Sequence, residues 1–211
     1  QKTAYEIYQC DWSSDVCSSD LGHELVGLDE EELADLRWRE IAVVFQGALN
    51  ALNPVQRIGD QIAEPVLIHE PGVSHDEAKG RARDLLEAVG IPASRVNSYP
   101  HEFSGGMRQR VMIAMSLACR PRLVIADEPV TALDVMTQAQ ILELLHQLKQ
   151  DFDLSLIMIS HDLSVLGDAC DRVQVMYAGK VAEVGAAASV FNNGARHPYT
   201  QRLLKSYPDI S

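Results

Sequence analysis

Short apolar runs alternate with longer segments in which apolar residues recur every three to four positions, and this alternation dominates the chain from residue 22 onward. The short runs predict buried strands at residues 41–45, 123–126, 154–159 and 172–177, followed by an edge hairpin strand at 180–184. Buried strands separated by amphipathic helices are typical of a largely parallel sheet with helices on both faces. The predicted fold class is therefore α/β.

Helical periodicity predicts helices at residues 33–38, 55–69, 74–89, 104–119 and 135–150, with short helices near residue 163 and at the C-terminal end. The helix over 74–89 has the clearest limits. Ser74 and Glu77 form a capping-box pattern at its start, and Gly90 and Pro92 stop it. The successive helices between residues 55 and 119 interrupt the strand–helix alternation and predict a helical subdomain.

Residues 1–21 have neither helical nor alternating periodicity. The stretch CDWSSDVCSSDL, residues 10–21, resembles the conceptual translation of a sequencing-library adapter rather than any protein family. A disordered polar tail or a secreted-type disulfide loop is the alternative. We expect residues 1–21 to be non-native and disordered, and we set them aside from the fold.

The composition narrows the classes of function. The 211 residues carry a net charge of −12, which disfavours a nucleic-acid binder. No apolar run approaches the roughly 20 residues that span a bilayer, so any association with a membrane is expected to be peripheral. Cys119 and Cys170 stand in apolar or helical contexts, and we expect them to be reduced, buried thiols of a cytosolic protein.

Functional side chains follow three of the predicted strands. The strand over 41–45 ends at Gln46, the strand over 123–126 at Asp127 and Glu128, and the strand over 154–159 at Ser160 and His161. Ligands of open α/β sheets bind at the carboxyl ends of the strands. We therefore expect these side chains to share one site.

The acidic side chains and the histidine can each be assigned a catalytic or metal-binding role, and each also has a purely structural explanation. Asp127 is a hard oxygen ligand suited to Mg²⁺, and Glu128 beside it could orient an attacking water and accept its proton. His161 could hold the phosphate and the water in line. The alternatives are a solvated turn for Asp127 and Glu128 and a structural histidine for His161.

The stretch FSGGM, residues 103–107, places two glycines at the start of a predicted helix. A helix N-terminus exposes unpaired N–H groups and favours an anion such as phosphate. Gly105 and Gly106 would remove the Cβ atoms that keep oxygens away, and Ser104 would add a hydroxyl donor. The alternative is a glycine pair that permits tight packing.

Together these residues resemble the ATP-binding subunit of ABC transporters. The chain contains five motifs similar to those of the family, in the family's order: Gln46 as the Q-loop, FSGGM as the signature, LVIADEP (123–129) as Walker B, TALD (131–134) as the D-loop and ISHDL (159–163) as the H-loop. The resemblance covers residues 22–211.

The resemblance is closest to the oligopeptide, dipeptide and nickel importer branch. It rests on the stretches VVFQGALNALNPV (43–55), YPHEFSGGMRQRVMIAMSLA (99–118), VMYAGK (175–180) and HPYTQRLL (197–204). Met107, where the wider family has glutamine, fits this branch. Gly47 and Val130 are departures from the pattern.

The resemblance implies a P-loop NTPase core with a helical subdomain at 55–119, a core segment at 120–185 and the start of a C-terminal extension at 186–211. It also implies that two subunits sandwich two ATP molecules. The catalytic residues would be Glu128 and His161, and Asp127 and Gln46 would bind Mg²⁺. The nucleotide would be contacted by Gln46, Ser104, Gly105, Gly106, Met107 and Asp134.

The implied function is an ATP-hydrolysing subunit of a bacterial peptide importer. Its partners would be a second ATPase subunit, two membrane permease subunits and an extracytoplasmic solute-binding protein, with no nucleic acid. It would lie peripherally on the cytoplasmic face of the inner membrane. The solute is chosen by the permease and the binding protein, so these residues do not identify it.

One family motif has no counterpart here: no G-x-x-x-x-G-K-[ST] phosphate loop (Walker A) occurs in the chain. In the family this loop precedes the Gln46 strand and cradles the β- and γ-phosphates. We therefore expect a fragment, truncated at both ends and lacking the N-terminal strands, that neither binds ATP tightly nor hydrolyses it alone. Two alternatives are a soluble ABC ATPase of DNA repair or translation, and a non-catalytic subunit that lends only its signature helix to a partner.

Overall fold

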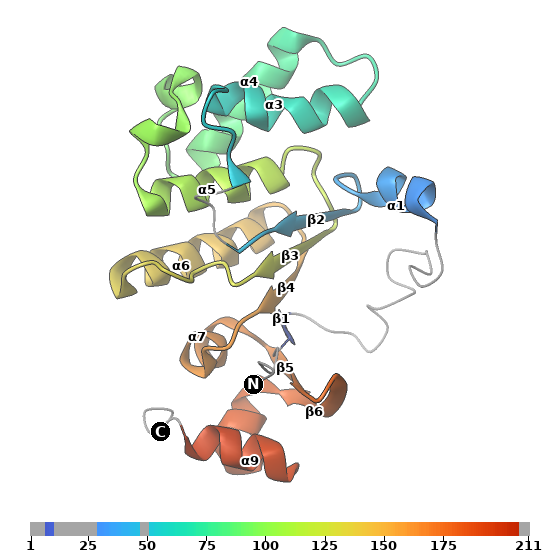
Figure 1. The fold of residues 1–211 in the computed structure, drawn as a ribbon, viewed down its shortest axis with the longest axis vertical. Coiled ribbons are helices and arrows are strands. Elements are labelled where there is room, and N and C mark those ends of the chain that lie inside the picture. The colour runs from blue at the N-terminus through green and yellow to red at the C-terminus, as the bar shows by residue number, and fades with distance from the viewer. Residues whose placement is uncertain (1–6, 11–28, 47–50, 207–211) are drawn as a thin grey trace.

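The computed structural model describes residues 7–10, 29–46 and 51–206. Its centre is a six-stranded sheet with the strand order β2-β3-β4-β1-β5-β6 (Figure 1). The strands are β1 (Ile7–Cys10), β2 (Ile41–Val44), β3 (Leu123–Asp127), β4 (Ser155–Ile159), β5 (Arg172–Tyr177) and β6 (Lys180–Ala186). The five strands predicted from the apolar runs are β2 to β6, and β5 has the predicted limits.

The strand directions confirm the α/β class. β2, β3 and β4 pair in parallel, whereas β1 is antiparallel to both β4 and β5. Because β4 and β5 both oppose β1, they run in the same direction as each other. All antiparallel pairings among the described strands therefore involve β1 or the hairpin strand β6.

Strand β1 corrects the expectation that residues 1–21 are disordered, as far as residues 7–10 are concerned. Ile7–Cys10 pairs with β4 on one side and β5 on the other. The physical reason is that a gap between these two strands would leave two rows of backbone N–H and C=O groups without partners, and an inserted strand satisfies both rows. The rest of the predicted non-native segment lies outside the described residues.

The described helices agree with the predicted ones to within a few residues. They are α1 (Glu30–Leu36), α3 (Ile58–His69), α4 (His75–Ala88), α5 (Gly105–Ser116), α6 (Val135–Asp151), α7 (Leu163–Ala169), α8 (Ala187–Ser189) and α9 (Pro198–Lys205). Short 3₁₀ turns at Ala93–Asn97 and Pro100–Glu102 lead into α5, and a π-helical turn at Val190–Gly194 precedes α9. None of the described helices combines the length and the apolar content that crossing a bilayer requires.

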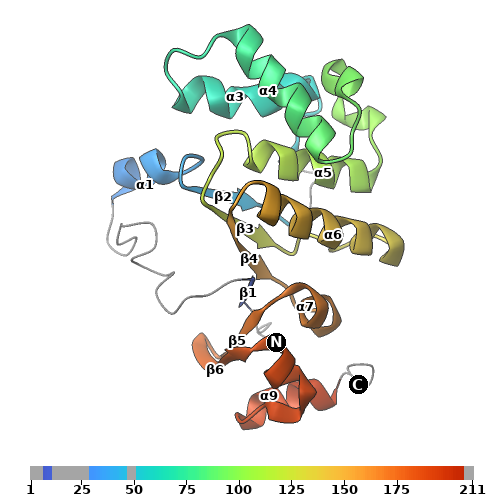
Figure 2. The same ribbon diagram turned by 180° about the vertical axis from the view of Figure 1, so that it is seen from behind.

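Helices α5, α6 and α7 lie on the same side of the sheet (Figures 1 and 2). Each connects parallel strands in the same direction along the sheet, and right-handed crossovers then place all three on one face. The side chains that point to this face are buried on four strands: Ala42, Val44, Val124, Ala126, Leu156, Met158, Val173 and Val175. This apolar layer fixes the strand register, because a slip by one residue would turn it toward the other face.

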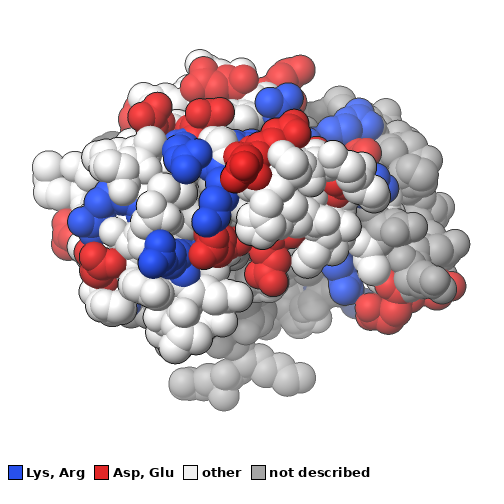
Figure 3. Space-filling model, turned by 90° about the horizontal axis from the view of Figure 1, so that it is seen from above, with Lys and Arg blue, Asp and Glu red and all other residues white. Residues whose placement is uncertain are grey.

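Helices α3, α4 and α5 pack together above the edge of the sheet that ends with β2 (Figure 1). Their shared core includes the fully buried Ile58, Ile62, Leu86 and Ile113. On the outer face of this unit, acidic and basic side chains are interspersed (Figure 3). The pairs Lys79–Asp60, at 2.9 Å, and Arg81–Glu70 are partly exposed, and such pairs contribute at most about 1 kcal/mol each.

Cys119 and Cys170 are free thiols, as predicted. Cys170 is buried, whereas Cys119 is only half-buried beside Glu70 and Arg81. Burial, with a smaller contribution from Glu70, raises the pKa of the Cys119 thiol to about 11. The thiol therefore stays protonated near neutral pH and acts as a packing group.

Gly59 and Gly80 provide a matched test of the packing of the helical unit. A Cβ atom on Gly59 would lie 2.8 Å from the backbone oxygen of Val96, whereas one on Gly80 would meet nothing within 4 Å. We predict that Gly59→Ala lowers the free energy of unfolding by about 1–3 kcal/mol, because backbone cannot yield to the methyl group. Gly80→Ala should raise it by up to about 1 kcal/mol. Urea titrations of the two variants test the packing, and equal effects would contradict it.

Candidate functional site

The three strand ends predicted to form a site lie at the same edge of the sheet. Val44 of β2 pairs with Ala126 of β3, and Asp127 pairs with Ile159 of β4. Gln46, Glu128 and His161 therefore follow neighbouring parallel strands by one or two residues. The sheet brings together at one edge residues that are more than a hundred positions apart in sequence.

A short contact in the site joins Glu128 to His161. The Nδ1 atom of His161 is 2.5 Å from Oε1 of Glu128. An ionised carboxylate can only accept a hydrogen bond, so Nδ1 is the donor. The Glu128 side chain is 11% exposed and that of His161 is 62% exposed, so the histidine lies on the solvent side of the carboxylate. These two residues, which were expected to share one site, are in direct contact.

The backbone turns sharply at Glu128. Its φ is 49°, in the left-handed region that non-glycine residues seldom occupy, at a cost of about 1–2 kcal/mol. The N–H of Glu128 donates to the carbonyl of Ile159 at 2.8 Å, so β4 holds the turned residue in place. This strained backbone, anchored to the next strand, sets the direction of the carboxylate.

A third residue, which the sequence did not single out for a role, contacts this carboxylate. The hydroxyl of Thr131 donates to Oε2 of Glu128, with 2.5 Å between the oxygens. The sequence signal for this bond was the position of Thr131 three residues after Glu128, across a turn that contains Pro129, because the first and fourth residues of a turn lie within about 7 Å of each other. Both oxygens of Glu128 thus accept a hydrogen bond.

Asp127 ends β3 beside Glu128. Its pKa is raised, first by burial and second by the charge of Glu128. A divalent cation bound by Asp127 would offset both effects, since its positive charge favours the ionised carboxylate. Gln46, the other predicted ligand, is exposed just beyond β2 at the same edge. Among the described residues, no group of three or more histidine, cysteine or acidic side chains is arranged so that it could hold a metal ion, so a cation here would need ligands from elsewhere, such as phosphate oxygens.

The FSGGM turn begins α5, as predicted. Ser104 is the N-cap, and its hydroxyl oxygen accepts from the N–H of Met107 at 3.3 Å. Ser104 and Gly105 are exposed, and Gly106 and Met107 are half-buried. The start of the helix therefore faces solvent, where an anion could reach its N–H groups.

The two glycines of this turn differ in whether the surrounding structure leaves room for a side chain. A Cβ atom on Gly106 would lie 2.6 Å from Cγ2 of Thr137 at the start of α6, whereas a Cβ atom on Gly105 would lie 3.8 Å from Leu133. Gly106 is required for the close approach of α5 to α6. The packing alternative therefore holds for Gly106, and only Gly105 is free of this constraint.

Asp134 is the N-cap of α6. It accepts from the N–H of Thr137 at 3.0 Å and from the Thr137 hydroxyl at 2.7 Å, and these bonds lower its pKa. Val135 and Met136 follow with 78% and 72% of their surface exposed. An exposed carboxylate beside two exposed apolar side chains, next to the FSGGM turn, is suited to contact a second molecule.

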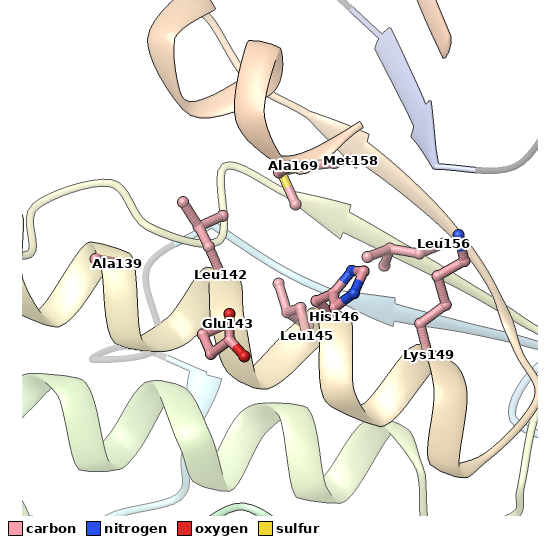
Figure 4. Close-up of a pocket in the computed structure, with 9 residues that line it drawn as sticks. All are labelled: Ala139, Leu142, Glu143, Leu145, His146, Lys149, Leu156, Met158 and Ala169. Carbon is pink, nitrogen blue, oxygen red and sulfur yellow. The ribbon is translucent and has the colours of Figure 1, made fainter. Parts of the chain in front are cut away.

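A cavity of about 360 Å³ lies away from these residues, between α6, β4 and the end of α7 (Figure 4). Its lining is mostly apolar and consists of Ala139, Leu142, Glu143, Leu145, His146, Lys149, Leu156, Met158 and Ala169. None of the predicted site residues lines it. The predicted site residues therefore lie at the open edge of the sheet, apart from this cavity.

Gly105 and Gly106 offer a paired test of this interpretation. We predict that Gly106→Ala lowers the free energy of unfolding by about 1–2 kcal/mol, because Thr137 is held by Asp134 and cannot move away. Gly105→Ala should change it by less than about 0.5 kcal/mol. Guanidinium titrations measure both values, and a Gly106→Ala variant as stable as the parent chain would contradict the packing role.

A model of the ABC transporter family matches residues 21–131. The chain is 52% identical over 191 residues to the oligopeptide transport ATP-binding protein OppD of Bacillus subtilis, covering 90% of the chain and 53% of that protein. It is 48% identical over 192 residues to the dipeptide transport ATP-binding protein DppD of Escherichia coli, covering 90% of the chain and 58% of that protein. The chain thus spans a little over half the length of these relatives.

Solved structures agree with this comparison. The dimeric post-hydrolysis state of the ATP-binding cassette MJ0796, bound to ADP and Pi, is similar with a TM-score of 0.66 and 30% identity over 76% of this chain and 68% of that one. The cbiO1 protein of Clostridium perfringens, part of the ABC transporter complex cbiONQ, is similar with a TM-score of 0.68 and 28% identity over 77% of this chain and 62% of that one. The family model matches more than half of this chain, and the order of its site motifs agrees with that match. The chain belongs to the ABC transporter family.

Proposed function

We propose that the protein is an ATP-binding and ATP-hydrolysing subunit of a bacterial ABC importer for peptides. The single observation that carries the chemistry is Glu128, held by His161 at the carboxyl edge of the sheet beside Asp127. The substrate class rests on the relatives, whose names describe oligopeptide and dipeptide transport.

In this proposal Glu128 is the general base. Its carboxylate orients a water molecule toward the γ-phosphate of ATP and accepts a proton from it. His161 donates to Oε1 of Glu128 and holds the carboxylate in the orientation needed for that proton transfer. Asp127 and Gln46 would hold Mg²⁺, which supplies positive charge for the phosphate oxygens when bound.

The exposed FSGGM turn would serve a second ATP site. Ser104, Gly105 and Gly106 would present their N–H groups, and Ser104 its hydroxyl, to the γ-phosphate of a nucleotide bound to another subunit. Met107 lies in the same turn. Asp134 is exposed at the start of α6 and is ordered by Thr137. It would communicate between the two subunits across the same interface. The similar MJ0796 cassette is described as dimeric, which supports a paired arrangement.

The other proposed partners follow from the importer function. Two membrane permease subunits would receive the motion of the helical unit α3–α5, and a solute-binding protein would deliver the peptide outside the membrane. The subunit would lie peripherally on the cytoplasmic face of the inner membrane. Its own phosphate contacts would come from a Walker A loop, a sequence that does not occur in these 211 residues.

We therefore predict that the 211-residue chain alone gives no saturable ATP binding at micromolar concentrations and no turnover. The reason is that the site lacks the backbone amides and the lysine that hold the β- and γ-phosphates. Isothermal titration with ATP and Mg²⁺, followed by a phosphate-release assay, measures both quantities. Micromolar affinity with a turnover that Glu128→Gln abolishes would contradict this prediction.

The hydrolytic role itself is tested in the complete subunit that contains a phosphate loop. Glu128→Gln should lower kcat at least about 100-fold and leave ATP binding in place, because it removes the base and not the binding groups. Glu143→Gln, an exposed glutamate on α6, is the matched control and should retain the parent kcat. Equal kcat values for the Glu128→Gln variant and the parent would refute the assignment of Glu128 as the base.

A further inference from the structure

We infer that Thr131 is a positioning residue that fixes the plane of the Glu128 carboxylate for proton transfer. The inference rests on the proposed function and adds a residue to it. Thr131 does not touch substrate in this account. It acts through the hydrogen bond from its hydroxyl to Oε2 of Glu128, at 2.5 Å.

Two hydrogen bonds define an orientation that one bond leaves open. The terminal torsion of a glutamate carboxylate is broad, so a single partner lets the group rotate about its axis. His161 holds Oε1 and Thr131 holds Oε2, and the two donors come from different segments, the residues after β4 and the turn after β3. With both in place, the remaining lone pairs of the carboxylate have a fixed direction.

Thr131 is itself held by the loop that carries it. Its N–H donates to the carbonyl of Glu128 at 3.2 Å, and the preceding residue, Val130, is buried in the core with 4% exposure. The side chain of Gln138 in α6 donates to the carbonyls of Val130 and Leu133, at 3.3 and 3.1 Å. The loop is therefore tied to α6 on both sides of Thr131, which gives its hydroxyl a defined direction.

The hydroxyl is the right chemical group for this role. A general base must remain ionised and keep a lone pair for the proton it receives. A neutral donor satisfies one oxygen of the carboxylate without neutralising it, whereas a lysine or arginine here would weaken it as a base. A purely structural explanation, in which Thr131 only closes the turn, predicts an effect on stability and none on the chemical step.

The test compares Thr131→Val, which keeps the shape and removes the hydroxyl, with Thr131→Ser, which keeps the hydroxyl. Both are made in the complete subunit assembled with its permease, and ATP hydrolysis is measured over a range of ATP concentrations. We expect Thr131→Val to lower kcat about 10- to 100-fold, as expected for loss of a hydrogen bond to a charged group, with KM changed less than about threefold. Thr131→Ser should stay within about threefold of the parent in both constants.

A double variant separates action through Glu128 from action elsewhere. Thr131→Val added to Glu128→Gln should cause no further loss of kcat, because the base is already absent. A full second loss, a Thr131→Val variant with the parent kcat, or a Thr131→Ser variant as slow as Thr131→Val would each overturn the inference. If Thr131→Val does not fold, Thr131→Ala takes its place in both comparisons.

Failure of the inference is distinguishable from failure of the proposed function. If the parent complex hydrolyses ATP and Glu128→Gln abolishes turnover while Thr131→Val does not slow it, only the role of Thr131 is wrong. If Glu128→Gln leaves turnover unchanged, the proposed base is wrong, and the inference about Thr131 is overturned with it.

Discussion

The parallel register of β3 and β4 is the constraint on which the rest of the site depends. Because Asp127 pairs with Ile159, the chain leaves both strands at the same level, and the turn at Glu128 can anchor its N–H on the carbonyl of Ile159. That anchor directs the carboxylate toward His161, two residues beyond the end of β4. The register in turn is set by the buried layer of apolar side chains that faces α5, α6 and α7.

The segment between Glu128 and Thr137 connects the two halves of the site. At one end Thr131 bonds to the carboxylate, and at the other Asp134 caps α6 by accepting from Thr137. Thr137 also packs against the position where Gly106 has no side chain, so the FSGGM turn is built onto the same segment. The proposed nucleotide contact at Ser104 and the proposed base Glu128 thus belong to one packed unit.

The sequence predicted the fold class, the order of the elements and the strand ends that meet in the site. This was possible because apolar periodicity and strand-end chemistry are local signals, clearest at Asp127, Glu128 and His161. It did not predict β1, because the pairing of Ile7–Cys10 depends on a gap between two strands that lie far away in the chain. The role of Gly106 in helix packing and the bond from Thr131 to Glu128 depend on tertiary geometry, and the left-handed backbone at Glu128 has no glycine to mark it.

The most direct test of the account is a crystal structure of the complete subunit carrying Glu128→Gln, grown with ATP and Mg²⁺. We predict a dimer in which the γ-phosphate lies between the side chain at position 128 of one copy and the Ser104 turn of the other, with Asp127 and Gln46 at the metal. A nucleotide bound away from the carboxyl edge of the sheet, or Ser104 turns that face solvent in both copies, would contradict it.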